Sequence, residues 1–199
     1  MSKLVSFLLH PLLVPTYMLL FLLGIDGMYT LILNWQLKLL LVGTVVTTTL
    51  ILPLFVIFLI FRIKLISSLS LPQREERIFP LITIAIFYTL TFYLLKNLFL
   101  PQFFQIFILG ATVTAIISLI INLFYRISLH MIAWGGVSGI CLGILFLSGE
   151  EGFVPLILSI LLSGIAGTAR MKVNAHQPLE IYSGWLAGVS VMSLSCLLF

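Results

Sequence analysis

Long stretches without a single charged residue limit what this chain can fold into more than any other feature. Residues 103–125 and 127–148 contain no Lys, Arg, Asp or Glu, and a helix that crosses a bilayer needs about 20 mostly apolar residues. Over the whole chain 61% of residues are hydrophobic and 8% are charged, whereas soluble domains average about 45–50% and about 25%. A chain with so few polar side chains cannot cover a water-soluble core. The sequence therefore predicts a polytopic membrane protein.

Seven apolar segments are candidate membrane spans. Together they predict an all-α transmembrane helix bundle of six to seven spans, in a single integral membrane domain covering residues 1–199. Pro11 and Pro15 in the first segment are expected to kink or break it. The seven segments are residues 4–24, 37–61, 80–97, 103–125, 127–148, 153–169 and 178–199.

Three polar connections are separated from one another by two spans each: residues 62–79, Arg126 with its neighbours, and residues 169–177. Two crossings return the chain to the side it left, so all three connections should lie on one face of the membrane. With the N-terminus, this face holds all the basic residues except Lys38 and Lys96. The positive-inside rule favours a cytoplasmic location for this face. Arginines that serve a site should not be counted, however, so the sequence does not decide which side of the membrane the face lies on.

No nucleic-acid partner is expected, because the basic residues form no continuous stripe.

Side chains that could bind a phosphate occur in these connections. Arg74 and Arg77 are three residues apart, which places both on one side of a helical turn, and guanidinium groups bind phosphate oxygens with two parallel hydrogen bonds. Ser128 and His130 stand at the start of a predicted helix, where unpaired N–H groups favour an anion. Taken alone, the arginine pair is more typical of a solvated loop end, and Ser128 with His130 is more typical of an interfacial histidine.

The third connection carries the sharpest pattern, Arg170-x5-His176-x3-Glu180. Pro178 predicts a helix start, so Glu180 should lie about one turn from His176. A carboxylate there accepts a hydrogen bond from one imidazole nitrogen and raises the basicity of the other. The three connections together offer cations for oxygens, one histidine to attack and another to protonate a leaving oxygen. That set suits in-line transfer of a phosphoryl group.

These motifs resemble, in the same order along the chain, the three signatures of the type 2 phosphatidic acid phosphatase-like superfamily. The resemblance covers about residues 70–199. The matching positions are Arg74, Arg77 and Pro80 for Lys-x6-Arg-Pro, Ser128, Leu129 and His130 for Pro-Ser-Gly-His, and Arg170, His176 and Glu180 for Ser-Arg-x5-His-x3-Asp.

The resemblance implies a metal-independent lipid phosphate phosphatase that needs no cofactor. His176 would be the nucleophile that forms a phosphohistidine, Glu180 would orient it, and His130 would be the general acid. The phosphate oxygens would be bound by Arg74, Arg77, Arg170 and Ser128.

The chain departs from the family pattern at several positions. Leu129 stands where the family has Gly, and Glu180 stands where it has Asp. The lysine of the first signature has no counterpart, because its position is Ser70, so Arg74 or Lys64 would have to fill its role.

The compatible substrates are phosphatidate, phosphatidylglycerophosphate, an isoprenoid diphosphate and a lipid A phosphate. The expected location is a bacterial inner membrane.

Two other interpretations stay open. In the first, the protein is a small transporter or lipid-binding protein without catalytic activity, and His10, His130 and His176 line a proton or ion path. In the second, Gly-Val-Ser-Gly at 136–139 resembles the Gly-x-Ser-Gly of rhomboid intramembrane serine proteases. Ser138 would then lie about 12 Å deeper along its helix than His130, which argues against the protease. Close packing of helices through these small residues is the simpler explanation.

Overall fold

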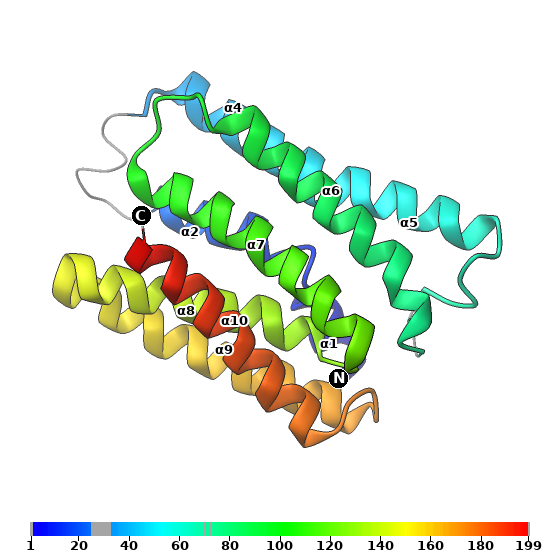
Figure 1. Cartoon of the computed structure of the whole chain (residues 1–199). Coiled ribbons are helices and arrows are strands. Elements are labelled where there is room, and N and C mark those ends of the chain that lie inside the picture. Colours follow the sequence, from blue (N-terminus) through cyan, green and yellow to red (C-terminus); the bar gives the residue numbers. More distant parts are fainter. Residues whose placement is uncertain (1, 25–32, 70, 72, 199) are drawn as a thin grey trace.

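The computed structural model describes residues 2–24, 33–69, 71 and 73–198, and every regular element in this part of the chain is a helix (Figure 1). Six helical stretches are long and apolar enough to cross a membrane, which confirms the prediction of an all-α, multi-pass membrane protein. These stretches are Trp35–Arg62, Glu75–Leu95, Gln102–Phe124, Leu129–Leu147, Phe153–Lys172 and Pro178–Leu198.

The first predicted span does not form one continuous helix. It is divided into α1 (Ser2–Leu8) and α2 (Val14–Gly24). Pro11 lies in the non-helical segment between them, and Pro15 lies in the first turn of α2, where its missing N–H costs no helical hydrogen bond. Both helices are shorter than the roughly 20 residues that a span requires. The break predicted from the prolines is therefore confirmed, and the described residues contain six candidate spans.

The second predicted span is one long helix with a widened turn in its middle. Pro53 lacks the N–H that would continue the α-helical ladder, and a π-helical turn precedes it, a common response to such an interruption. The Thr48 hydroxyl in this turn lies 2.7 Å from the Thr91 hydroxyl of the neighbouring helix. The successive parts are α4 (Trp35–Val45), the π-helical turn Val46–Ile51 and α5 (Leu52–Arg62).

Five further helices complete the bundle. Short 3₁₀ turns at Glu75–Arg77 and Gly149–Gly152 precede two of them. The connections that precede α6, α8 and α10 lie at the same end of the bundle as α1, at the right of Figure 1. This arrangement agrees with the expectation from span parity. The helices are α6 (Ile78–Leu95), α7 (Gln102–Phe124), α8 (Leu129–Ser148), α9 (Phe153–Lys172) and α10 (Pro178–Leu198).

Helix α8 packs against α10 more extensively than any other two helices pack, and the contact runs through small residues. A Cβ atom added at Gly135 would collide with a carbonyl oxygen of α10, and one added at Gly188 would collide with the carbonyl oxygen of Ile132. The two backbones are thus in direct contact. At one end of this interface, a Cβ on Gly184 would lie 2.9 Å from the Ser128 carbonyl oxygen. The close approach therefore places the start of α8 beside the start of α10.

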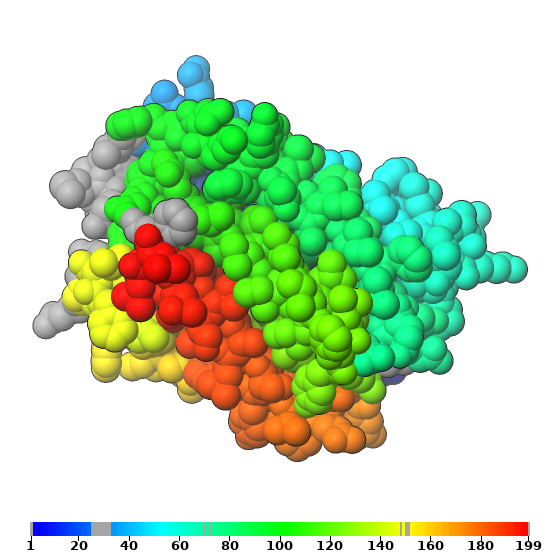
Figure 2. Space-filling model, viewed as in Figure 1, coloured from blue at the N-terminus to red at the C-terminus, as the bar shows by residue number. Residues whose placement is uncertain are grey.

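The largest group of buried apolar residues joins α2, α4, α6, α7, α8 and α10, and includes Leu19, Leu41, Phe104 and Ile140. A smaller buried group lies nearer the polar end, where the indole N–H of Trp134 donates to the carbonyl oxygen of Leu9 at 3.1 Å. Figure 2 shows α7 and α10 side by side on one face of the bundle. The outer surface exposes many large apolar side chains, as expected for a bundle surrounded by acyl chains.

Candidate active site

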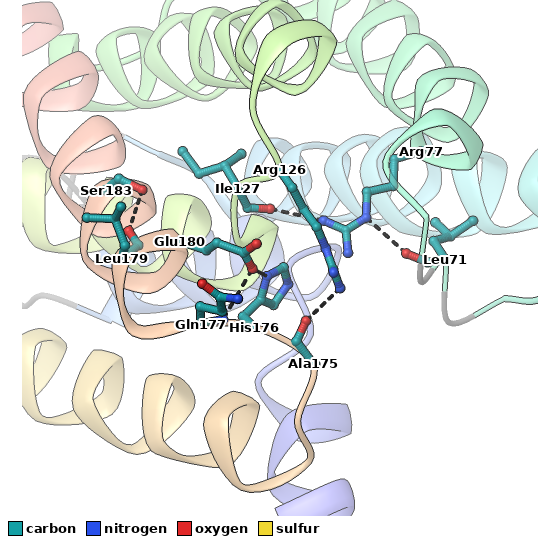
Figure 3. Close-up of polar contacts among 10 residues, drawn as sticks. All are labelled: Leu71, Arg77, Arg126, Ile127, Ala175, His176, Gln177, Leu179, Glu180 and Ser183. Atoms are coloured by element: carbon teal, nitrogen blue, oxygen red, sulfur yellow. Dashed lines mark hydrogen bonds and ion pairs between the residues drawn. The ribbon is translucent and has the colours of Figure 1, made fainter.

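His176 and Glu180 form a close pair at the start of α10 (Figure 3). The Nδ1 atom of His176 lies 2.6 Å from the Oε2 atom of Glu180, and the two side chains are 2% and 13% exposed. The N–H of Gln177 donates to the same carboxylate oxygen at 3.3 Å. Pro178 begins the helix, so Glu180 sits in its first turn, where the helix dipole stabilises a negative charge. With the proton on Nδ1, the Nε2 atom of His176 carries the lone pair.

The pKa of His176 is lowered from 6.5 to about 4. Burial is the largest cause, because it disfavours the charged ring. The positive charges of Arg77 and Arg170 act in the same direction, and the hydrogen bond to Glu180 opposes them. The ring is therefore neutral near pH 7, which is the state that a nucleophilic imidazole requires.

Arg77 links two of the polar connections, the one at residues 62–79 and the one around Arg126. Its side chain is nearly enclosed, with the residue 3% exposed. Its Nε–H donates to the Leu71 carbonyl oxygen at 2.9 Å, and an NH1 hydrogen donates to the Ile127 carbonyl oxygen at 3.0 Å. Two backbone acceptors thus hold the guanidinium group, which forms no direct ion pair with a described carboxylate, on the side of the site that faces His176 (Figure 3).

Arg126 is a site residue that the sequence did not predict. Its side chain reaches toward His176 (Figure 3) and donates from NH2 to the Ala175 carbonyl oxygen at 2.8 Å. Its Nε atom is buried and has no hydrogen-bond partner among the described residues. The charge of Arg126 interacts with those of Arg77 and Arg170. The only sequence signal was its position two residues before the Ser-Leu-His motif.

Arg170 in the last turn of α9 is the third arginine of this group. Its NH1 group donates to the Ser6 hydroxyl at 2.9 Å, and its Nε atom is buried without a partner. Arg77, Arg126 and Arg170 lie close enough to repel one another, and the nearby carboxylate of Glu180 is already bonded to a histidine. This excess of positive charge, fully buried at Arg77 and partly buried at the other two arginines, favours an anionic ligand.

Ser128 and His130 lie where the sequence placed them, at the start of α8. The Ser128 N–H donates to the main-chain carbonyl oxygen of Glu180 at 3.2 Å, and the Ser128 hydroxyl is buried with no hydrogen-bond partner in the described part of the chain. His130 is close enough to His176 for their charges to interact. Its Nε2–H donates to the Ser6 carbonyl oxygen at 3.1 Å, so this nitrogen holds a proton.

The N-terminal segment supplies two residues that the motifs did not reveal as part of a phosphate site. Ser6, buried on the apolar helix α1, contacts both His130 and Arg170. The ring of His10 stands edge-on to that of His130, with centroids 5.4 Å apart and planes at 80°. The position of Ser6 between apolar residues of α1 was the one available signal for it.

Arg74 and Lys64, the two candidates for the missing lysine role, lie apart from this group. The Arg74 side chain is 37% exposed and contacts the Glu75 carboxylate at 3.3 Å. It also donates to the Phe124 carbonyl oxygen at 2.8 Å, which pairs an otherwise open acceptor at the end of α7. Lys64 is exposed in the turn after α5. The structure thus brings Arg126, and not Arg74, together with His176.

Ser138, the nucleophile of the protease interpretation, belongs to a contact between α8 and α9. Its hydroxyl donates to the Trp134 carbonyl oxygen at 3.2 Å and lies 3.1 Å and 3.5 Å from the hydroxyls of Ser159 and Ser163. No histidine is among these described partners, so nothing activates the hydroxyl as a nucleophile. Gly139 packs against the backbone of α10, which agrees with a packing role for this segment.

The described residues contain no group of three His, Cys, Asp or Glu side chains that could hold a metal ion. Comparison with known proteins gives no match to any family model, curated protein or solved structure. Any functional assignment therefore depends on the geometry of the site and on the order of the three motifs.

Proposed function

We propose that the protein is an integral membrane phosphatase that hydrolyses a lipid phosphate or diphosphate through a phosphohistidine. The observation that carries this proposal is the buried His176–Glu180 pair beside three arginines. The arrangement provides a neutral imidazole, a carboxylate that orients it and an excess of positive charge. The resemblance to the type 2 phosphatidic acid phosphatase-like superfamily points to the same chemistry.

In the first step, the Nε2 atom of His176 attacks the phosphorus atom. The bond from phosphorus to the lipid oxygen breaks as the nitrogen–phosphorus bond forms, and the lipid oxygen takes the Nε2 proton of His130 in its doubly protonated form, which becomes a neutral ring. Glu180 stabilises the positive charge that develops on the attacking ring. The products of this step are the free lipid alcohol, or lipid monophosphate, and a phosphorylated His176.

In the second step, water attacks the phosphohistidine. His130, now lacking its Nε2 proton, accepts a proton from the water. The oxygen–phosphorus bond forms and the nitrogen–phosphorus bond breaks, which releases inorganic phosphate and restores neutral His176. Both histidines thus return to their starting protonation states.

The arginines supply the electrostatic part of the mechanism. Arg77, Arg126 and Arg170 would hold the phosphoryl oxygens and stabilise the charge that they carry in the transition state. These three groups provide the positive charge that a metal ion provides in many phosphatases, so the proposed reaction is metal-independent. In the structure, Arg170 and His130 donate hydrogen bonds to oxygen atoms of Ser6. In the complex with substrate, Arg170 would donate to the phosphate instead, and His130 would donate to the leaving oxygen.

Phosphatidate, phosphatidylglycerophosphate, an isoprenoid diphosphate and a lipid A phosphate all carry the group that this site would cleave. A location in a bacterial inner membrane belongs to the same proposal.

Release of phosphate from a panel of these four lipids by the purified protein in detergent micelles tests the proposal. We expect at least one lipid to be hydrolysed, with inhibition by vanadate and no loss of rate on addition of a chelator. Failure to release phosphate from any of them would favour a transporter or lipid-binding protein. A strict requirement for a divalent metal would contradict the phosphohistidine mechanism.

The lowered pKa of His176 predicts an unusual acid limb for the reaction. Because attack requires the neutral ring and its pKa is about 4, the acid limb of the kcat/KM profile should be half-maximal near pH 4. A half-maximal rate near pH 6.5, the ordinary value for histidine, would contradict this environment.

The same shift in pKa has a consequence for stability. Between pH 6.5 and about 4 the unfolded chain binds a proton at His176 that the folded chain does not. The contribution of His176 to the free energy of unfolding is therefore fully present above pH 6.5 and is lost as the pH falls toward 4. Melting temperatures of the wild type and His176→Ala across this range should show a shallower decline in the variant.

Arg126→Ala should lower kcat/KM by about 10²–10³-fold, the usual cost of removing one group that stabilises transition-state charge. Arg74→Ala is the matched control, and we expect it to change kcat/KM less than threefold because Arg74 contacts Glu75 and the end of α7. Arg126→Lys should restore part of the rate, since lysine keeps the charge without the planar fork. A larger loss of kcat/KM in Arg74→Ala than in Arg126→Ala would indicate that Arg74 takes the place of the lysine in the first family signature.

A further inference from the structure

The break between α1 and α2 leaves the Ser6 carbonyl group open toward α8. In a continuing α-helix the His10 N–H would bond to the Ser6 carbonyl oxygen, but it donates to that of Phe7 at 3.2 Å. Phe7 would otherwise lack a donor, because Pro11 has no N–H. The Ser6 carbonyl oxygen is therefore available, and it accepts the Nε2–H of His130 at 3.1 Å.

A second open carbonyl group anchors the same break to α8. The Leu13 N–H donates to the carbonyl oxygen of His10 at 2.9 Å. The carbonyl oxygen of Leu9 is thus free to accept the indole N–H of Trp134 at 3.1 Å. His130 and Trp134 are four residues apart, so they lie on the same face of α8. Two side chains of this face hold the break against the start of the helix.

The ring of His10 has a fixed orientation beside His130. Its Nδ1 atom accepts the N–H of Leu12 at 3.3 Å, so the neutral ring carries its proton on Nε2. The centroids of the two rings are 5.4 Å apart and their planes make an angle of 80°, an arrangement that aromatic rings favour. The ring of His130 is therefore held at one atom by the Ser6 carbonyl group and along its side by the ring of His10.

His10 adds no positive charge to this group near pH 7. Burial, the larger cause, and the charge of Arg170 lower the pKa of His10 from 6.5 to about 4. The charged and titratable groups that act on His130 are Arg170 of α9, His176 of the connection before α10, and His10 itself. A cationic His130, which the proposed reaction requires, would be opposed by a further charge at this position. A neutral His10 avoids that opposition.

Packing alone does not account for a histidine in this break. Its neighbours in the break are a proline and leucines, and an apolar side chain would fill the same space without the cost of taking a polar ring out of water. The chain contains three histidines, and His130 interacts with both of the others. All the imidazole rings of the protein thus meet in one group.

We propose that the break between α1 and α2 is an active-site element of this protein, in which His10 is a positioning residue for the general acid His130. The inference rests on the proposed function, because the proposed reaction gives His130 its role. His10 itself touches none of the reacting atoms. It holds the ring of His130 in place when the Nε2–H leaves the Ser6 carbonyl oxygen for the leaving oxygen, and it adds no second charge beside that ring.

Two variants of nearly identical shape test the inference. His10→Asn and His10→Asp both remove the ring and keep an oxygen that can accept the Leu12 N–H, but only the second adds a negative charge. We expect kcat to fall about tenfold in His10→Asn, a part of the roughly 10²–10⁴-fold that a general acid contributes, with KM changed less than about twofold. A residue that only fills space would not affect kcat in this selective way.

The pH profile separates a positioning role from a packing role. The basic limb of kcat/KM reports the loss of the proton from His130. It should lie about one to two pH units higher in His10→Asp than in His10→Asn, the shift expected for a unit charge about 5–6 Å away at an effective dielectric constant of about 20. Basic limbs that coincide in the two variants would overturn the inference.

Tyr17→Phe is the matched control for damage to the break. The Tyr17 hydroxyl donates to the Leu8 carbonyl oxygen at 3.0 Å, so this variant removes a hydrogen bond from the same segment and leaves the ring of His10 in place. We expect kcat to stay within about twofold of the wild type and the basic limb to stay unmoved. An equal loss of kcat in Tyr17→Phe and His10→Asn would assign the effect to a loosened break and would refute the role of His10.

Nuclear magnetic resonance of the ¹⁵N-histidine-labelled protein in micelles needs no substrate, and it separates failure of the inference from failure of the proposed function. In the wild type we expect His10 to be neutral near pH 6, with its proton on Nε2, because its pKa is about 4. The titration midpoint of His130 should be at least about one pH unit higher in His10→Asp than in His10→Asn.

These results without phosphate release from any lipid would support the link between the two rings and count against the phosphatase alone. A His10 ring that is charged near pH 6 in the wild type would overturn the inference even if neither variant folds. Equal midpoints of His130 in the two folded variants would overturn it whatever the enzymatic activity.

Discussion

His176→Ala should lower kcat for phosphate release by about 10³-fold or more while the protein stays folded, because the variant lacks the attacking nitrogen. The ring is nearly enclosed, and its Nδ1–H is already committed to Glu180, so no other described imidazole can take its place without rearrangement. Rapid quenching of the wild type with a ³²P-labelled substrate should trap an acid-labile phosphoprotein. The variant should trap none.

Glu180→Gln tests the second half of the same pair. The amide keeps the shape of the side chain but removes the negative charge that fixes the proton on Nδ1, so we expect a loss of about 10²–10⁴-fold in kcat. Glu75→Gln is the matched control, because Glu75 is an exposed carboxylate that contacts only Arg74 among the described ion pairs. Full activity in His176→Ala would remove the proposed nucleophile, and an unchanged rate in Glu180→Gln would assign that carboxylate a structural role.

Gly188→Ala should destabilise the protein by about 3 kcal/mol or more, at the upper end of what overpacking costs. The added Cβ would collide with the carbonyl oxygen of Ile132, and neither backbone can move aside without separating α8 from α10. Gly164→Ala adds the same atom to α9, where nothing lies within 4 Å. There we expect a small gain of about 0.5–1 kcal/mol, because alanine is the better helix former.

Thermal unfolding in detergent, followed by size-exclusion chromatography, measures both glycine variants. The expected loss in Gly188→Ala should be accompanied by a loss of phosphatase activity, because the same helix contact aligns Ser128 with Glu180. Equal melting temperatures for the two variants would show that α8 and α10 are not in the backbone contact described above.

The sequence predicts the fold well because the membrane imposes simple rules on length and hydrophobicity. Six of the predicted segments correspond to the six spans, and the prolines of the first segment foretold its break. Span parity foretold that three polar connections would share one end of the bundle. The His176–Glu180 pair was also accessible, since a helix start at Pro178 fixes the distance between the two side chains.

The sequence predicts the residues of the site less well. Long side chains can reach several alternative partners, and the tertiary structure determines which of these partners lie nearby. Arg74 and Arg126 both carry guanidinium groups that reach several ångströms, and spacing favoured Arg74. In the structure Arg74 reaches the open end of α7, whereas Arg126 reaches the loop that carries His176. Ser6 escaped notice for a related reason, since it lies far from every motif in the sequence.

The contacts of Ser6 have a consequence for biogenesis. Helix α1 bonds to Arg170 and His130 through Ser6, while Glu180 lies in the first turn of α10 and His176 lies just before that helix. A growing chain would therefore carry Arg77, Arg126 and Arg170 without the Glu180 carboxylate until α10 has been inserted and docked on α8. The far end of α10 lies at the opposite end of the bundle from α1 (Figure 1), so a change in α1 would disturb the arginine group directly, whereas a change at the far end of α10 would not.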